Sequence, residues 1–289
     1  MLRILLVVPL NEEFTEVLKI LRGLRHEVRD GEFLYTLDSQ NRDITITGVV
    51  LGEAGPMPAA QRVERLIGLV NPTLIVVMGI AGSLSKDVKL GDVVVAEEVD
   101  HYLANSKTNP ANDGTFHLLM SGRHVRTSHL IIQAIRNFEF AAANIYHAWQ
   151  LACKSENSPT PVYKLGHIAC GDSVGDAVEF KTFLLAHNRK FLAMEMESSG
   201  IAESAMARPI PIPLLILRGI SDNAQDKQEL DETSKGSWRA AAVRNATLFL
   251  THLCKWPDFL ALMRKSPDNT VSIHQAHLQD VIRFIKDNE

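Results

Sequence analysis

Short apolar runs rich in branched side chains alternate along this chain with longer segments in which apolar residues recur every three or four positions. Runs of the first kind are typical of buried strands. They lie at residues 4–10, 44–50, 74–78, 92–96 and 214–217. Strands that alternate with helical segments predict an α/β domain with a largely parallel sheet.

The second pattern predicts a helix that starts directly behind Asn11. Its apolar face, at positions i, i+3, i+4 and i+7, is formed by Phe14, Val17, Leu18 and Leu21. Residues 131–149 also have a helical pattern. Turn-rich loops are predicted at 109–114 and 155–161, on either side of that segment.

The last part of the chain has a character of its own. A loop is predicted at residues 266–269, followed by a helix with one apolar stripe. The stripe consists of Leu278, Val281, Ile282 and Ile285. We therefore expect one domain over residues 1–254 and a helical C-terminal extension over residues 255–289.

Composition narrows the class of protein. With 289 residues, 46% hydrophobic and 22% charged, the chain is typical of a globular protein with a sizeable core. A net charge of −4 gives no reason to expect nucleic acid as a partner. The apolar run at residues 4–10 is too short for a signal peptide core or a membrane span, so no membrane partner is expected.

The cysteines and histidines bear on the cell compartment and on metal binding. Three cysteines without paired spacing form no even disulfide framework, which predicts a reducing compartment, the cytoplasm. The 11 histidines form no recognisable ligand motif, so we expect neither a metal nor a cofactor.

The most informative stretch for chemistry is Met194-Glu195-Met196-Glu197-Ser198-Ser199-Gly200. Residues 191–194 are predicted to be a strand, Ser198 or Ser199 a helix cap, and Gly200 the start of the helix. On an extended backbone, acids two residues apart point the same way. We expect Glu195 and Glu197 to bind the 2′- and 3′-hydroxyls of a ribose, where a carboxylate also stabilises oxocarbenium charge.

Two further acids follow predicted strands. Glu13 lies between the first strand and the first helix, where it could deprotonate a water or simply cap the helix. Asp222 follows the run at residues 214–221 and could protonate a departing purine or belong to a turn.

Small residues follow two other strands. The sequence Gly79-Ile80-Ala81-Gly82 is predicted to end the strand at 74–78 and would let a flat ring approach the backbone. Residues 170–176 are either a backbone-lined edge for a base or a plain loop. Within them, Cys170 is expected to be a buried structural thiol. The glycines at 52–55 lack the spacing of a phosphate-binding loop.

Taken in order, five stretches resemble the nucleoside phosphorylase and nucleosidase superfamily, most closely its methylthioadenosine/S-adenosylhomocysteine nucleosidase branch. They are Pro9-Leu10-Asn11-Glu12-Glu13, Gly79-Ile80-Ala81-Gly82 with residues 90–95, Cys170-Gly171-Asp172-Ser173, residues 194–202 and residues 218–224. The resemblance covers about residues 3–254. It implies a three-layer α/β/α fold with a mixed, mostly parallel central sheet, a homo-oligomer with a dimer favoured, and cleavage between ribose and a purine base.

The resemblance also implies roles for individual residues. Glu13 would activate the attacking water, Glu197 would hold the ribose and Asp222 would protonate or hydrogen-bond the base. The other expected substrate-binding residues are Ala81, Gly82, Ser173, Val174, Glu195, Met196 and Ser221.

Hydrolysis and phosphorolysis differ in the expected charge near the nucleophile. Phosphorylases of the superfamily hold phosphate with arginines after the first strand and before the glycine-rich segment, whereas this chain has Asn11-Glu12-Glu13 and Met78 there. A carboxylate repels phosphate and suits water, so the resemblance favours a nucleosidase.

Two departures from that branch concern the substrate. Val174 stands where the related enzymes carry an aromatic residue, and Ile80 replaces a small polar one. Segment 101–161 is also longer, and its basic residues could bind a 5′-phosphate or be solvated surface. These are His101, Lys107, Arg123, His124 and Arg126.

We therefore expect a purine nucleosidase, with adenine as the base and a nucleoside or nucleotide as the small-molecule partner. The alternatives are a purine nucleoside phosphorylase, a nucleotide-depleting effector of bacterial immunity and a nucleoside-binding protein without turnover. The 5′ substituent and the oligomeric state are left open by the sequence.

Overall fold

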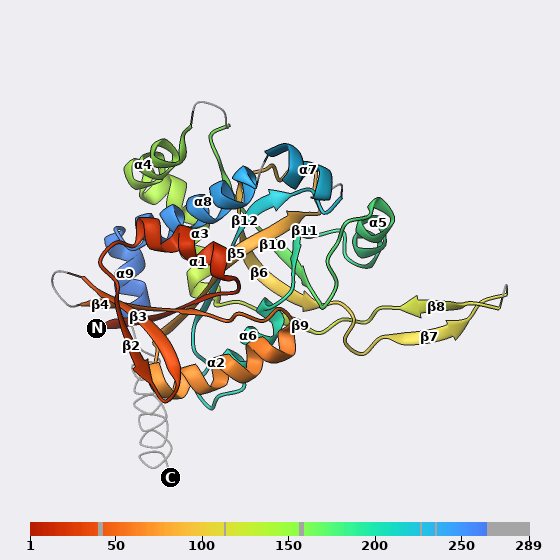
Figure 1. The fold of residues 1–289 in the computed structure, drawn as a ribbon, viewed down its shortest axis with the longest axis horizontal. Coiled ribbons are helices and arrows are strands. Elements are labelled where there is room, and N and C mark those ends of the chain that lie inside the picture. The colour runs from red at the N-terminus through yellow and green to blue at the C-terminus, as the bar shows by residue number, and fades with distance from the viewer. Residues whose placement is uncertain (40–42, 113, 156–158, 226, 235, 265–289) are drawn as a thin grey trace, which may run out of the picture.

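A ten-stranded sheet forms the centre of the protein, and helices cover it (Figure 1). The computed structural model describes residues 1–39, 43–112, 114–155, 159–225, 227–234 and 236–264. The strands are β1 (Leu2–Val8), β2 (Arg25–Arg29), β3 (Glu32–Asp38), β4 (Ile44–Val50), β5 (Leu74–Ser83), β6 (Val93–His101), β7 (Lys107–Pro110), β8 (Phe116–Leu119), β9 (His124–Arg126), β10 (Tyr163–Cys170), β11 (Phe191–Glu195) and β12 (Leu214–Asp222).

Two groups of helices pack on opposite faces of this sheet. The described helices are α1 (Asn11–Ile20), α2 (Pro56–Val70), α3 (His129–Ala141), α4 (Ala143–Cys153), α5 (Val178–His187), α6 (Ser198–Met206), α7 (Lys227–Ser234), α8 (Ser237–Leu253) and α9 (Pro257–Arg264). Figure 1 shows α1, α3, α4, α8 and α9 on one face, and α2 with α6 on the other. The predicted α/β fold class, with three layers, is confirmed.

Alternation along β1 shows why both faces are covered. Ile4 and Leu6 belong to the hydrophobic core under α1 and α8, whereas Leu5 and Val7 belong to the core under α2 and α6. All four side chains are fully buried. A strand that buries both faces reads as a continuous apolar run, which is the pattern that residues 4–10 show.

The sheet folds back on itself at one side, and this closure positions the site. The strand order is β11-β10-β6-β12-β5-β1-β4-β3-β2, and β11 also pairs with β5. The pairing aligns Met194 with Gly82 and Ala193 with Ser83 in antiparallel register. As a result, the chain that leaves β11 passes directly beside the carboxyl ends of β5 and β12.

The predicted end of a strand at Met78 is wrong. β5 continues through Gly79 and Gly82 to Ser83, because β12 pairs with it as far as Gly82 and β11 pairs with Ser83. An added Cβ at Gly79 would lie 2.6 Å from Arg218 Nη1 and 2.9 Å from Glu13 Oε1. The glycines therefore make room for charged side chains within the strand and do not form a turn.

The helix predicted over residues 131–149 is two helices. Ala142 has φ −133° and separates α3 from α4. Rings of Phe138 in α3 and Trp149 in α4 lie 5.6 Å and 5.0 Å from the ring of Phe249. A straight helix would separate the two backbones by about 16 Å, so the break lets both aromatic residues pack on one side chain of α8.

The turn-rich loop predicted at 109–114 is part of a hairpin. Asn109 and Pro110 lie in β7, which pairs with β8 in antiparallel register. Figure 1 shows this hairpin projecting away from the body of the molecule. Polar turn residues were correctly located, but the short strands beside them have no alternating apolar pattern that would predict them.

The C-terminal extension is described only in its first part. Trp256 and Phe259 are buried and belong to the core under α8, where Trp256 lies 5.5 Å from the ring of Phe138. The predicted apolar stripe at 278–285 lies outside the described residues. The division at residue 254 stays a prediction. Among the described residues, no helix has the length and apolarity needed to cross a membrane.

Gly200 in α6 allows a very close contact between α6 and α2, next to the cavity described below. An added Cβ there would lie 1.8 Å from the carbonyl oxygen of Pro56, at the start of α2. The contact brings the Gly55 amide to the carboxylate of Glu197. Gly68, also in α2, has no atom within 4 Å of an added Cβ.

We expect Gly200→Ala to lower the free energy of unfolding by about 2 kcal/mol or more, since backbone atoms of two helices would have to separate. Gly68→Ala is the matched control and should raise stability by up to about 1 kcal/mol, because alanine loses less entropy on folding into a helix. Urea titration followed by circular dichroism measures both. Equal stability of the two variants would contradict the tight α2–α6 contact.

Candidate active site

A cavity of about 300 Å³ opens where β1, β5, β11 and β12 end. Side chains and backbone from segments far apart in the sequence line it. They are Pro9, Leu10, Glu13, Ala54, Ile80, Ala81, Gly82, Ser173, Val174, Gly175, Met194, Glu195, Met196, Glu197, Arg218, Asp222 and Arg239. Cavities at the carboxyl ends of strands are a common place for ligands in α/β proteins.

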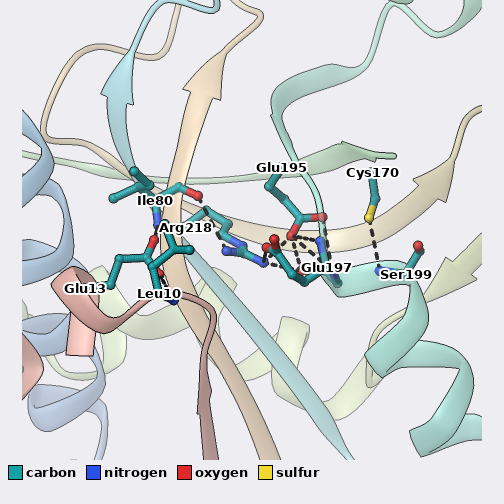
Figure 2. Close-up of polar contacts among 9 residues, drawn as sticks. Leu10, Glu13, Ile80, Cys170, Glu195, Glu197, Ser199 and Arg218 are labelled. Carbon is teal, nitrogen blue, oxygen red and sulfur yellow. Dashed lines mark hydrogen bonds and ion pairs between the residues drawn. The ribbon is translucent and has the colours of Figure 1, made fainter. Parts of the chain in front are cut away.

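Arg218 of β12 lies at the centre of the polar groups (Figure 2). Its side chain is 1% exposed, and its Nη2 donates to Glu195, to Ser198 Oγ at 2.9 Å and to Glu197 Oε2 at 3.4 Å. Burial disfavours its charge, yet Glu195, Glu197 and Glu13 together raise the pKa of Arg218 above its ordinary value. The guanidinium is therefore a fixed positive charge inside the site.

The carboxylate of Glu195, at the end of β11, accepts several hydrogen bonds from the start of α6. Its Oε2 accepts from the backbone N of Glu197 at 3.1 Å, from the backbone N of Ser198 at 3.0 Å and from Ser198 Oγ at 2.9 Å, besides Arg218. The predicted capping by Ser198 or Ser199 is wrong: α6 begins at Ser198 because Glu195 satisfies its first amides.

Glu197 is the second acid of the predicted pair, and its environment differs from that of Glu195. It stands at the N-cap of α6 with φ −123° and ψ −31°, so the backbone is not extended there and the two carboxylates do not form the symmetric pair that the spacing predicted. Burial raises the pKa of Glu197 to about 7, opposed by Arg218 and reinforced by the charges of Glu195 and Glu13.

Glu13 bridges two backbone amides across the cavity floor. Its Oε2 accepts from the backbone N of Leu10 at 2.9 Å, and its Oε1 accepts from the backbone N of Ile80 at 2.8 Å. The first bond caps α1, as one of the two readings predicts, and the second ties the carboxylate to β5. The role of Glu13 as a base stays a prediction. Burial raises its pKa, with the nearby Arg218 opposing the shift. A raised pKa suits a general base near neutral pH.

Asp222, the last residue of β12, lies beside Gly82 of β5, two residues beyond the Ile80 amide that Glu13 contacts. Its Oδ2 accepts from Ser221 Oγ at 2.8 Å and its Oδ1 from the backbone N of Ala224 at 2.9 Å. An added Cβ at Gly82 would lie 2.7 Å from Asp222 Oδ1, so only glycine leaves room for this acid. Glu13 meets β5 at Ile80 and Asp222 meets it at Gly82, which separates the contacts by about 7 Å along the strand.

The remaining predicted residues lie mostly in the same place. Six of the seven line the cavity, namely Ala81, Gly82, Ser173, Val174, Glu195 and Met196. Ser221 is the exception, and it contacts Asp222. Cys170 is buried and its Sγ accepts from the backbone N of Ser199 at 3.3 Å. Burial raises the pKa of Cys170 well above its ordinary value, which disfavours a reactive thiolate.

Two arginines of the cavity were missed from sequence. Arg218 interrupts an otherwise apolar, fully buried run, and a buried charge of that kind requires partners, which is a signal that could have found it. Arg239 lies in the first turn of α8, where a basic residue has no pattern that points to a site.

The basic residues of segment 101–161 lie elsewhere. Arg123 pairs with Glu203 at 3.0 Å, and both His124 and Arg126 contact Glu98. In the part of the chain that the structure describes, none of the five residues singled out from sequence lines the cavity. Likewise, no group of three or more His, Cys, Asp or Glu that could hold a metal is found among the described residues.

Similar sequences were found among known proteins. A 5′-methylthioadenosine/S-adenosylhomocysteine nucleosidase of Haemophilus ducreyi is 25% identical over 187 residues, which cover 62% of this chain and 68% of that protein. A protein of the same name from Staphylococcus saprophyticus is 28% identical over 170 residues, 59% of this chain and 65% of its own length. These alignments span about two thirds of each relative.

Solved structures share the fold. The futalosine hydrolase of Helicobacter pylori has a TM-score of 0.66 at 21% identity, covering 88% of this chain and 97% of that chain. A 5′-methylthioadenosine/S-adenosylhomocysteine nucleosidase from the same organism has a TM-score of 0.66 at 20% identity, covering 88% and 99%.

Most of the chain also matches the model of a protein family. The model described as the phosphorylase superfamily matches residues 3–255, which include every residue of the cavity. The chain belongs to the phosphorylase superfamily, as the five ordered sequence stretches predicted.

Proposed function

We propose that this protein hydrolyses the N-glycosidic bond of a purine nucleoside or nucleotide, with adenine as the base. The observation that carries the proposal is that Glu13, Glu197 and Asp222 line one cavity around a buried arginine. The similarity to nucleosidases supports the same reaction class. Water would be the nucleophile, and the products would be the free base and the sugar.

Each acid has a separate proposed task. Glu197 accepts hydrogen bonds from the ribose hydroxyls and stabilises positive charge on the ring as the bond breaks. Glu13, held by two amides, takes a proton from the attacking water. Asp222, at the other end of the stretch of β5 that it shares with Glu13, hydrogen-bonds or protonates the departing base, while Ser221 orients its carboxylate.

Glu195 and Arg218 have supporting roles: Glu195 positions Glu197, and Arg218 affects the ionisation of Glu13 and Glu197. Glu195 fixes the start of α6, and so the backbone that carries Glu197. The positive charge of Arg218 favours the ionised form of both Glu13 and Glu197. Ala81, Gly82, Ser173, Val174 and Met196 would supply the walls for the nucleoside.

Cell location and assembly belong to the same proposal. We place the protein in the cytoplasm as a homodimer. Cys153, Cys170 and Cys254 are free thiols, which supports a reducing compartment. The projecting hairpin leaves Phe116 65% exposed, and a subunit partner would cover such a side chain.

We expect Glu13→Gln and Asp222→Asn each to lower kcat by about 100-fold or more with little change in ligand affinity, since both act mainly in the transition state. Glu197→Ala should weaken binding as well, because it holds the sugar. Release of free base measured by chromatography, with titration calorimetry for affinity, checks all three. Glu64→Gln, an exposed acid on α2, is the control. Normal turnover in the first two variants would refute the assignment.

The reaction class is tested with a panel of adenosine, methylthioadenosine, adenosylhomocysteine, AMP, inosine and guanosine, each with and without phosphate. We expect free base and free sugar at the same rate in both conditions, because a carboxylate faces the nucleophile position. Strict dependence on phosphate, with ribose 1-phosphate as product, would replace hydrolysis by phosphorolysis.

The raised pKa of Glu197 predicts how stability depends on pH. The pKa of Glu197 is about 7 in the folded protein, above its ordinary 4.5. The folded state therefore binds a proton more tightly than the unfolded state, which stabilises the folded state at low pH. This stabilisation is lost as pH rises through 7. Between about pH 5.5 and about pH 8 the loss should be about 2 kcal/mol.

Glu197→Gln should remove that loss, because the amide does not titrate. Urea denaturation of the wild type and the variant at both pH values measures the difference. Identical pH dependence of the two proteins would show that Glu197 titrates in its ordinary range.

A further inference from the structure

A second cation, Arg239, lines the cavity and lies near Glu13. Arg239 in the first turn of α8 is among the lining residues, and its side chain is 25% exposed. Its charge lowers the pKa of Glu13, so the guanidinium lies close to that end of the cavity. Arg239 also bonds to Glu12, the neighbour of Glu13 on α1, whose side chain is 59% exposed.

The positions of the acids determine how a nucleoside would lie. In the proposed reaction, Asp222 and Gly82 would hold the base and Glu197 would hold the two hydroxyls. The remaining ring substituent, carbon 5′ on C4′, would then point toward the lining residues that hold neither group. Leu10, Glu13 and Arg239 are such residues, and they lie together because Glu13 accepts from the Leu10 amide and Arg239 lies near Glu13.

The charges at this end favour an anion on carbon 5′. Arg218 is already balanced by the three glutamates, so it is not available to a substrate anion. Arg239 instead pairs with Glu12, and a pair with a carboxylate that is 59% exposed contributes little because water solvates that carboxylate well. A guanidinium that exchanges Glu12 for a substrate oxyanion forms charge-assisted hydrogen bonds of matching planar geometry.

We propose that Arg239 forms an anion subsite that binds an anionic oxygen group attached through carbon 5′ of the substrate, either a phosphate or a carboxylate. The inference rests on the proposed N-glycosidic hydrolysis and narrows its substrate class from purine nucleosides in general to those with a negatively charged 5′ substituent. Arg239 also offsets the repulsion between that anion and Glu13.

The test compares Arg239→Leu with the wild type on four adenine substrates. AMP carries a phosphate and adenosylhomocysteine a carboxylate, whereas adenosine and methylthioadenosine are neutral at carbon 5′. We expect kcat/KM to fall about 10-fold to 100-fold more for AMP, for adenosylhomocysteine or for both than for the neutral pair, for which only the effect of Arg239 on the pKa of Glu13 is lost. Whichever anion shows the loss identifies the group.

Two further variants separate recognition from structure. Arg208→Leu removes a comparable surface pair, with Glu64, and should leave all four rates unchanged. Arg239→Lys keeps the charge without the planar fork and should recover part of the lost rate for the anionic substrate. If Arg239→Leu folds poorly, the affinities of Asp222→Asn and of Asp222→Asn with Arg239→Gln for AMP and adenosine give the same comparison without turnover.

The possible failures are distinct. Equal losses for neutral and anionic substrates, or a wild type that cleaves only neutral ones, would overturn the anion subsite and leave the hydrolytic function intact. Absence of free base from every substrate with the wild type would instead overturn the proposed function itself.

Discussion

The buried positive charge of Arg218 is the constraint on which the site depends. A guanidinium that is 1% exposed requires compensation, and it has three carboxylates around it, from α1, the end of β11 and the N-cap of α6. The three acids around this one buried cation leave an excess of negative charge next to Arg218. Burial and mutual repulsion therefore raise the pKa of Glu197, and burial raises that of Glu13. The charge balance that permits a buried arginine thus also sets the proton affinity of the acids that we propose to do the chemistry.

Backbone geometry brings these charges together. The return of β11 onto β5 places Met194 beside Gly82, so that Glu195 and Glu197 follow directly, and the pairing of β12 with β5 places Arg218 beside Gly79 and Asp222 beside Gly82. Glycines are required at both points because the space that a Cβ would occupy is taken by the charged groups. Backbone amides of regular elements hold Glu13 and Glu195 in place by hydrogen bonds.

In the function that we propose, the cavity divides into a part that carries the chemistry and a part that selects the substrate. Glu13, Glu197, Arg218 and Asp222 lie on the central sheet and the first turns of the helices that leave it, whereas Arg239 comes from the first turn of α8 at the rim. If the substrate lies as we propose, a change of residue at the rim would alter what fits at carbon 5′ and would leave the groups bonded to Arg218 in place. Proteins that share a fold can differ in substrate, because residues at the rim of a site can change while the sheet stays the same.

Local pattern determined the fold class, the family and the positions of Glu13 and Asp222, because a polar residue that ends a buried strand is visible in a few neighbouring residues. It did not determine which of Glu195 and Glu197 accepts the hydrogen bonds from the first amides of α6, since that depends on the non-extended backbone of Glu197 and on where those amides lie. Nor did it reveal the partners of Arg218 or the arrival of Arg239, which come from segments far apart in the chain. Only the tertiary structure decides these points, because the energy of a charge depends on which other charges and how much water surround it, and sequence spacing does not specify either.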